Sequence, residues 1–370
     1  MMKKKIHLAL LFGGRSGEHE VSLMSARSVL SVLDPAKYEV TKIGITPDGK
    51  WLTGDDVLGK LEAGKLSGLE PVVVTPDPSE SGIYVLREKK LEKLCDVDVY
   101  FPLLHGTFGE DGTIQGLLEL GNAAYVGAGV AGSAVGMDKG IFKDVMRTHG
   151  IPSVESVLLL RSEIEKDINA AVARAEQAGA YPLFTKPANL GSSVGIMKCH
   201  TRSDLQEGLM EAARFDRRVL VEKGVANVRE IEVSVLGNED PRASVPGEVL
   251  PSREFYSYES KYIDGTSGLV IPAPLPEEIT RRIQELAVRA YKAIDAAGMA
   301  RVDFLIDKDT GEVYLNELNT IPGFTKISMY PKLWSATGMP YAELVDRLID
   351  LALQRKGERN RTSHSYRSQA

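Results

Sequence analysis

VYLNELNTIPGFT, the stretch from Val313 to Thr325, begins as an apolar β-strand and ends in polar residues. Asn316, Glu317 and Asn319 follow within the same run before Pro322 interrupts it. Burying such groups without partners costs about 1–3 kcal/mol each, and a core strand gains nothing from them. The polar end therefore predicts that a ligand or an ion pairs with these side chains.

The strand ARVDFLI, residues 300–306, precedes that stretch and is separated from it by the short turn DKDTG. A hairpin of the two strands brings Asp303 near Glu317 and Asn319, and strand alternation places Glu317 and Asn319 on one face. Two carboxylates and one amide oxygen suit Mg²⁺. Arg301 shares the strand face of Asp303, where its positive charge would stabilise a developing oxyanion. The alternative is a solvated hairpin edge that binds no ligand.

A loop of small residues, PANLGSSVG at 187–195, lies between two predicted strands. Its backbone N–H groups can converge on an anion, and Lys186 supplies a positive charge directly before it. Lys139, at the head of a predicted helix, is a second candidate phosphate ligand. The loop lacks the Walker pattern, and both lysines could instead be solvated surface residues.

The first third of the chain alternates predicted strands and helices. Continuous apolar strands separated by helices predict a parallel sheet with right-handed crossovers. The predicted segments are a strand at 6–12, a helix at 22–33, a strand at 38–45, a strand within 97–106 and a helix at 113–120.

Two loops, GGRSGEHE and LHGTFGEDG, leave the carboxyl ends of these strands, where such sheets bind ligands. Glu18 and His105 are therefore candidates for a shared crevice. Two alternatives stay open. His105 could be a structural hydrogen-bonding residue rather than a general base, and the acidic run from Glu18 to Glu20 could be the first turn of a helix.

The composition changes near Gly127, where a loop of small residues predicts the start of a new domain. The loop at 252–268 carries Tyr256, Tyr258 and Tyr262 among polar residues and ends in glycines, which is typical of a mobile lid. A plain aromatic cluster is the alternative. Further predicted elements are a helix at 163–178, a helix at 276–297 and a disordered tail at 356–370.

The length of 370 residues suits two or three domains. The net charge of −6 argues against a general binder of nucleic acids or membrane surfaces, because these partners require a basic face. Cys95 and Cys199 form neither a disulfide framework nor a metal-ligand spacing, which favours a reducing compartment. The run at 6–12 ends without a signal-peptide cleavage site, and 120–137 is too glycine-rich to span a membrane. We therefore expect a soluble protein of the cytoplasm.

Seven motifs follow one another along the chain: GGRSGEHEVSL, LHGTFGEDGTIQGLLEL, YVGAGVAGSAVGMDK, TKPANLGSSVGI, ESKYIDG, ARVDFLI and NELNTIPGFT. Together they closely resemble the D-alanine–D-alanine ligases, which are ATP-grasp enzymes of peptidoglycan precursor synthesis. The resemblance runs from about Lys5 to Leu353. One such motif alone would be unspecific, whereas seven in this order are highly specific.

The resemblance implies a combined α/β and α+β fold. A Rossmann-like domain with a parallel sheet would occupy 1–127, and the two parts of an ATP-grasp fold would occupy 128–224 and 225–355. The implied ligands are D-alanine, ATP and two Mg²⁺ ions, for which Mn²⁺ can substitute. The implied protein is a homodimer without nucleic-acid or membrane partners.

The resemblance also implies a role for particular residues. ATP would be contacted by Lys139, Lys186, Ser193, Glu222, Lys223, Val225, Glu230, Lys261, Asn316 and Glu317. The metal ions would be held by Asp303, Glu317 and Asn319. The substrates would be bound by Glu18, His105, Arg301, Gly323, Ser328 and Met329. The catalytic set would be Glu18, Ser192, Tyr262, Arg301 and Gly323.

The implied reaction begins when ATP phosphorylates the carboxylate of one D-alanine, and the amine of a second D-alanine then attacks the acyl phosphate. Arg301 and the Gly323 N–H would stabilise the tetrahedral oxyanion. Tyr262 favours D-alanine over D-lactate as the second substrate. Three alternatives are a D-alanine–D-lactate ligase, a phosphotransferase with a stable phosphorylated product, and a catalytically silent nucleotide-binding regulator.

Overall fold

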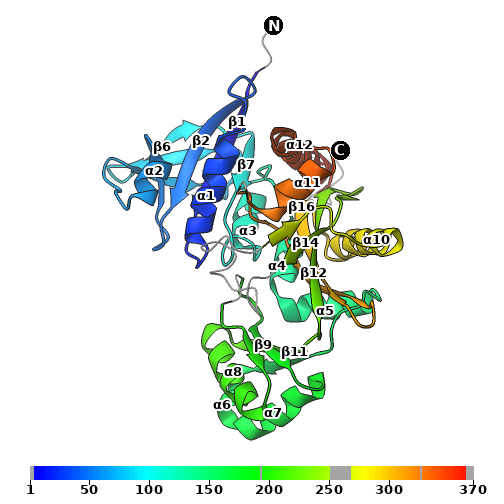
Figure 1. Cartoon of the computed structure of the whole chain (residues 1–370). Coiled ribbons are helices and arrows are strands. Elements are labelled where there is room, and N and C mark those ends of the chain that lie inside the picture. Colours follow the sequence, from blue (N-terminus) through cyan, green and yellow to red (C-terminus); the bar gives the residue numbers. More distant parts are fainter. Residues whose placement is uncertain (1–3, 192–193, 251–267, 326, 364–370) are drawn as a thin grey trace.

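The computed structural model describes residues 4–191, 194–250, 268–325 and 327–363. These ranges form three β-sheets, each drawn from one continuous part of the sequence. Figure 1 shows the first sheet in blue and cyan, the second in green at the lower end, and the third beside the yellow helix α10. No helix within the described ranges is long and apolar enough to cross a membrane.

The first sheet is mixed. Strand β1 pairs in parallel with β2 and β7, whereas the pairs from β2 to β6 are antiparallel. The three strands predicted to be parallel are β1, β2 and β7, and their parallel pairing is confirmed. The sequence did not predict β3 to β6, which are antiparallel because connections as short as residues 46–50 turn the chain back without a crossover helix. The strands in spatial order are β6 (Lys90–Cys95), β5 (Ile83–Arg87), β4 (Glu70–Val74), β3 (Trp51–Thr53), β2 (Tyr38–Ile45), β1 (Ile6–Gly13) and β7 (Val99–Pro102).

Helix α1 begins and ends three residues before the predicted 22–33. Glu18 is its N-cap residue and Glu20 lies in its first turn, where a carboxylate interacts favourably with the helix dipole. The Ser22 hydroxyl accepts a hydrogen bond from the Gly13 N–H at 2.7 Å, which holds the start of the helix to the end of β1. The helices up to residue 148 are α1 (His19–Leu30), α2 (Val57–Glu62), α3 (Thr113–Leu120), α4 (Val130–Met137) and α5 (Lys139–Thr148).

The second sheet is antiparallel, in the order β10-β9-β11-β8. The predicted hairpin around the small-residue loop is confirmed by the pairing of β9 with β10. The predicted single helix at 163–178 is wrong. Asp167 interrupts it with an extended backbone, and its side chain caps the next helix by accepting the Ala170 N–H. The elements are β8 (Ser156–Leu160), α6 (Arg161–Lys166), α7 (Ile168–Ala175), β9 (Leu183–Pro187), β10 (Met197–Cys199), α8 (Arg202–Phe215) and β11 (Arg218–Lys223).

The third sheet presents one apolar face and one polar face, as strand alternation requires. Val233 and Val302 are fully buried in the core formed with α10, whereas their neighbours Glu232, Arg301 and Asp303 line a cavity on the opposite face. The elements are β12 (Val228–Gly237), β13 (Arg242–Ala243), β14 (Gly247–Leu250), β15 (Gly268–Val270), α10 (Glu277–Ala293), β16 (Gly298–Asp307), β17 (Val313–Asn319), α11 (Met329–Ala336) and α12 (Tyr341–Arg359).

Part of the C-terminal segment that was predicted to be disordered belongs to the last helix. Helix α12 continues to Arg359, so the prediction is wrong for 356–359, and 364–370 lie outside the described residues. Arg359 forms an ion pair with Glu119 at 2.5 Å and donates to the Ala123 carbonyl oxygen at 2.9 Å. These contacts hold the end of α12 against α3 and the residues that follow it.

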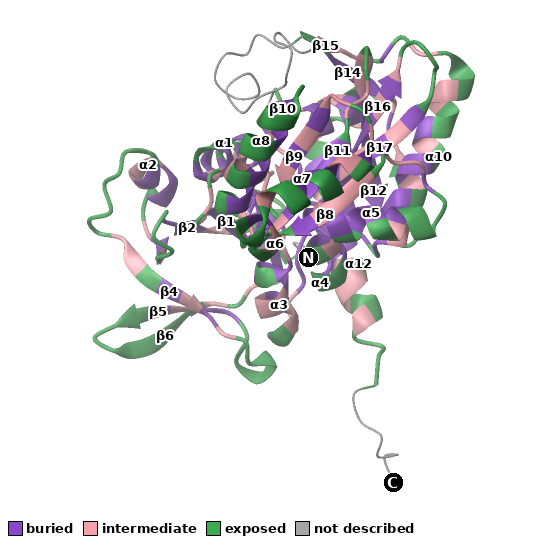
Figure 2. Cartoon of the chain, turned by 90° about the horizontal axis from the view of Figure 1, so that it is seen from below, coloured by how far each residue is buried: buried purple, intermediate pink, exposed green. Residues whose placement is uncertain are grey.

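Phe324 connects the first sheet to the third through aromatic packing. Its ring is fully buried and lies 6.0 Å from the ring of Phe101 on β7. The rings of Tyr330 and Tyr341 lie 5.4 and 6.2 Å away. Figure 2 shows the buried residues concentrated in the sheets and the exposed residues on the outer helices and the β5–β6 hairpin.

We expect Phe324→Ala to lower the free energy of unfolding by about 3–5 kcal/mol, because it leaves a cavity in this aromatic cluster. Urea unfolding followed by circular dichroism measures the loss. Leu91→Ala is the control, since that side chain is 52% exposed and should change stability by less than about 0.5 kcal/mol. Equal losses in both variants would contradict the proposed importance of the cluster.

Candidate active site

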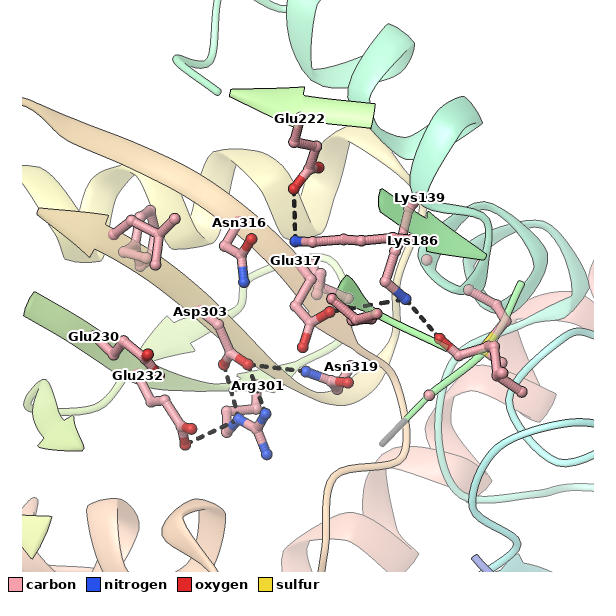
Figure 3. Close-up of a pocket in the computed structure, with 18 of the residues that line it drawn as sticks. Lys139, Lys186, Glu222, Glu230, Glu232, Arg301, Asp303, Asn316, Glu317 and Asn319 are labelled. Atoms are coloured by element: carbon pink, nitrogen blue, oxygen red, sulfur yellow. Dashed lines mark hydrogen bonds and ion pairs between the residues drawn. The ribbon is translucent and has the colours of Figure 1, made fainter. Parts of the chain in front are cut away.

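One cavity collects side chains from all three sheets. Glu18 and His105 come from the loops after β1 and β7, Lys186 from the end of β9, and Arg301 from β16. Figure 3 shows Lys186 and Glu222 of the second sheet, together with Lys139 of α5, facing the polar surface of the third sheet. The predicted site residues that line the cavity are Glu18, His105, Lys139, Lys186, Glu222, Lys223, Val225, Glu230, Arg301, Asp303, Asn316, Glu317, Asn319 and Gly323.

The remaining predicted residues do not line this cavity or are not described. The Ser328 hydroxyl accepts the Thr325 N–H at 3.0 Å, beside the cavity wall. Met329 packs with Val249 and Leu333 in a small apolar cluster and does not line the cavity. Ser192, Ser193, Lys261 and Tyr262, together with the rest of the predicted lid, lie outside the described residues.

The predicted hairpin forms the floor of the cavity. Asp303 on β16 is opposite Glu317 on β17, and Arg301 is opposite Asn319. The Asn319 amide donates to Asp303 at 3.2 Å. The pairing register shifts directly after Asp303, so the strand pair is irregular where Asn316 joins the cavity lining. The prediction that these oxygen-bearing side chains meet on one face is confirmed.

Arg301 lies between two carboxylates. Its guanidinium donates to Asp303 at 2.8 and 2.6 Å and forms an ion pair with Glu232 at 3.0 Å. Burial lowers its pKa, but Asp303 and Glu232 outweigh burial and raise the pKa well above the usual value. Arg301 is therefore a permanent, oriented cation in the cavity, suited to stabilise an oxyanion.

The donor set of the floor fits Mg²⁺. Asp303, Glu317 and Asn319 offer two carboxylates and an amide oxygen, and Mg²⁺ commonly takes a few protein oxygens together with substrate phosphates. Within the described ranges, no group of three or more histidine, cysteine, aspartate or glutamate residues is placed to hold a metal ion. A divalent ion here would therefore depend on the amide and on oxygens from a ligand.

Two lysines approach the floor from the other side of the cavity. Lys139 at the start of α5 donates to the Leu190 carbonyl oxygen at 2.7 Å, and its Nζ lies 3.9 Å from a Glu317 carboxylate oxygen. Lys186 lies 2.6 Å from the carboxylate of Glu222, which is 3% exposed. The cavity thus has cations opposite the oxygen donors, as a polyanionic ligand with a divalent ion requires.

His105 makes two structural hydrogen bonds. Its Nδ1–H donates to the Ile321 carbonyl oxygen at 2.9 Å, so Nε2 accepts from the Ser25 hydroxyl, also at 2.9 Å. Ser25 in turn accepts the Phe324 N–H at 3.3 Å. Burial lowers the pKa of His105, although nearby Glu18 opposes the shift. A neutral imidazole with both nitrogens occupied favours the structural alternative over a general base.

Glu110 binds the other backbone group of Ile321. Its carboxylate accepts the Ile321 N–H at 3.0 Å and the Gly106 N–H at 2.8 Å. A Cβ atom at Gly109 would lie 1.9 Å from the Leu104 carbonyl oxygen, so only glycine permits this tight loop. The loop of the first sheet therefore holds the backbone that leads to Gly323.

The sequence did not predict a role for Glu110, Glu232 or Lys143. Glu110 lies within a recognised motif but was given no role. Glu232 follows Glu230 by two residues, and strand alternation could have placed both on one face. Lys143 follows Lys139 by four residues, a helical spacing that puts both on one side of α5. No pattern in the sequence indicates that Lys143 is buried.

Two family models match most of the chain. The model described as D-ala D-ala ligase N-terminus matches residues 7–128, and the model described as D-ala D-ala ligase C-terminus matches residues 145–350. A D-alanine–D-alanine ligase from Heliobacterium modesticaldum is 50% identical over 363 residues, which cover 98% of each chain. One from Thermoanaerobacter sp. strain X514 is 51% identical over 98% of this chain and 99% of its own.

Solved structures are similar along nearly the whole chain. The D-alanine-D-alanine ligase from Coxiella burnetii has a TM-score of 0.82 and 37% identity, and covers 96% of both chains. The VanG D-Ala:D-Ser ligase from Enterococcus faecalis has a TM-score of 0.84 and 35% identity, and covers 94% of this chain and all of its own. The three-sheet architecture is thus the ATP-grasp arrangement that the sequence predicts.

The ionisation of Glu110 should be visible in the pH dependence of stability. Burial, and then the charge of Glu18, raises the pKa of Glu110 from 4.5 to about 8. The folded protein therefore keeps a proton that the unfolded chain releases between these pH values, and the contribution of Glu110 to stability falls as pH rises through this window. Glu110→Gln cannot titrate. We expect the melting temperature of the variant, relative to wild type, to rise from pH 5 to pH 8.

Differential scanning calorimetry at both pH values measures this shift. Glu165→Gln, at an exposed position on α6, is the matched control and should show no such trend. A difference between wild type and Glu110→Gln that stays constant from pH 5 to pH 8 would contradict the raised pKa.

Proposed function

The chain belongs to the D-alanine–D-alanine ligase family, and we propose that it joins two D-alanine molecules at the expense of ATP, releasing ADP and phosphate. The observation that carries this proposal is the meeting, in one cavity, of Arg301, an oxygen-rich floor, two lysines and Glu18. Metal donors and phosphate ligands alone would serve any nucleotide site. A carboxylate for an ammonium group and a fixed cation for an oxyanion suit amide formation.

We propose that ATP lies between the second sheet and the polar face of the third. Lys139 and Lys186 would contact its phosphates, and Lys223, Val225 and Glu230, which also line the cavity, would contact the nucleoside. Asp303, Glu317 and Asn319 would hold two Mg²⁺ ions, or Mn²⁺ in their place, and the bound ions would neutralise phosphate charge during transfer.

The first chemical step transfers the terminal phosphoryl group to the carboxylate of the first D-alanine. A carboxylate is a poor electrophile, whereas an acyl phosphate carries a good leaving group. Glu18 would bind the ammonium of this substrate. The lysines reduce the repulsion between the carboxylate and the phosphates, which is the main barrier to bringing two anions together.

In the second step the amine of the second D-alanine attacks the acyl carbon, and phosphate leaves with the electrons of the broken C–O bond. Arg301 and the Gly323 N–H would stabilise the negative oxygen of the tetrahedral intermediate. The hydrogen bonds of His105 and Glu110 to Ile321 support the role of the Gly323 N–H, because they hold the backbone two residues before Gly323. Ser328 would bind the second carboxylate.

The lid and the cellular setting are proposed from the sequence and the family. Ser192 and Tyr262 would link to Glu18 and close the loop at 252–268 over the substrates, with Ser193 and Lys261 on the phosphates. Tyr262 would favour an amine over the hydroxyl of D-lactate. We further propose a homodimer through the N-terminal part, working in the cytoplasm, where ATP is supplied, on peptidoglycan precursors.

The decisive experiment identifies the product by mass after incubation with Mg²⁺-ATP. We expect ADP release and D-alanyl-D-alanine with D-alanine alone, and no product with L-alanine. Parallel reactions with added D-lactate or D-serine test the acceptor, since the Enterococcus faecalis relative is described as a D-Ala:D-Ser ligase. A depsipeptide at neutral pH would contradict the role given to Tyr262. The absence of ADP from every reaction would favour the silent regulator.

We expect Glu317→Gln to lower kcat by at least 100-fold, because the amide removes a negative metal donor from the floor. A coupled ADP-release assay at saturating substrates measures the loss. Glu312→Gln is the matched control: it lies on the same hairpin, is exposed, and does not line the cavity. Wild-type turnover in Glu317→Gln would exclude this carboxylate from the reaction.

A further inference from the structure

Lys143 is a buried lysine to which the proposed reaction gives no role. Its side chain is 2% exposed, and its Nζ lies 2.9 Å from the Oε1 atom of Glu222. The other oxygen of Glu222 lies 2.6 Å from Lys186. Glu222 and Lys186 line the cavity, whereas Lys143 lies behind them. Lys143 is thus connected to the cavity through its ion pair with Glu222.

The three charges form one buried cluster. Burial lowers the pKa of Lys143, and Glu222 opposes that shift. Burial raises the pKa of Glu222, but the two lysines outweigh it and bring the value to about 2. Glu222 is thus a carboxylate at any physiological pH. Each oxygen of Glu222 contacts one lysine, one at the cavity wall and one behind it.

Lys186 has two competing partners in the proposed ATP complex. It is paired with Glu222 here, and the phosphates would attract the same ammonium group. A buried carboxylate that loses its only counter-ion is strongly destabilised. Lys143 provides a second counter-ion on the side away from the cavity, so Glu222 stays compensated when Lys186 is drawn to phosphate.

We propose that Lys143 is a positioning residue for nucleotide binding, which holds Glu222 in place and so leaves Lys186 available to the phosphates. The inference rests on the proposed ATP site. It differs from a purely structural role in one respect. A structural lysine would support the fold whatever ligand is bound, whereas a positioning lysine affects nucleotide affinity only as long as Glu222 is charged.

A double-mutant cycle separates the two roles. Wild type, Lys143→Met, Glu222→Gln and the double variant are titrated with ADP by calorimetry, and KM for ATP and kcat are measured. We expect Lys143→Met to weaken ADP binding and raise KM for ATP at least tenfold, with kcat within threefold of wild type. In the Glu222→Gln background the same substitution should change ADP affinity by less than threefold.

The matched control is Lys166→Met, an exposed lysine on α6, which should leave affinity and kinetics unchanged. Melting temperatures show whether each variant folds. Should Lys143→Met not fold, Lys143→Gln removes the charge but keeps a polar side chain. It should then weaken ADP binding at least threefold in wild type and not in Glu222→Gln.

Three results would overturn the inference. One is unchanged ADP affinity in the folded Lys143 variant. Another is an equal loss of affinity with and without the Glu222 charge, and the third is a loss confined to melting temperature. Failure of the proposed function is distinguishable, because wild type itself would then not form the dipeptide, whereas failure of this inference leaves dipeptide formation by wild type intact.

Discussion

Charge compensation between buried side chains is the constraint on which the site depends. Arg301 is held by Asp303 and Glu232, and Glu222 is held by two lysines. A buried charge without a partner costs several kcal/mol, so each functional charge must be accompanied by an opposite one. The same pairs orient the groups. Because Arg301 has two carboxylate partners, it would retain Glu232 if Asp303 bound the proposed metal ion.

Hydrogen bonds to the backbone connect the first sheet to the strand end of the third sheet. His105 and Glu110, both from the loop after β7, bind the carbonyl and the N–H of Ile321. Phe324 then packs against Phe101 on β7. The loop that would stabilise the oxyanion is therefore positioned by the first sheet, which also supplies Glu18. Glu18 and the backbone near Gly323 are thus parts of one connected structure.

Local patterns predicted the elements well where the structure is itself local. The hairpin of β16 and β17 follows from alternation and a short turn, and α3 has its predicted bounds. The antiparallel part of the first sheet was missed, because its strands are short and half exposed and carry little apolar periodicity. Asp167 divides a predicted helix because its side chain competes for backbone N–H groups, and contacts with Glu119 extend the last helix to Arg359.

The sequence by itself determined which residues share a strand face, and its motifs determined the family. Both depend on spacing along the chain, which folding does not change. Only the tertiary structure decided that His105 is a structural residue, that Glu110 is buried beside Glu18, and that Lys143 supports Glu222. The partners of such residues lie far away in sequence, 216 residues in the case of His105 and Ile321. Their burial, and hence their ionisation, arises only when separate sheets pack together.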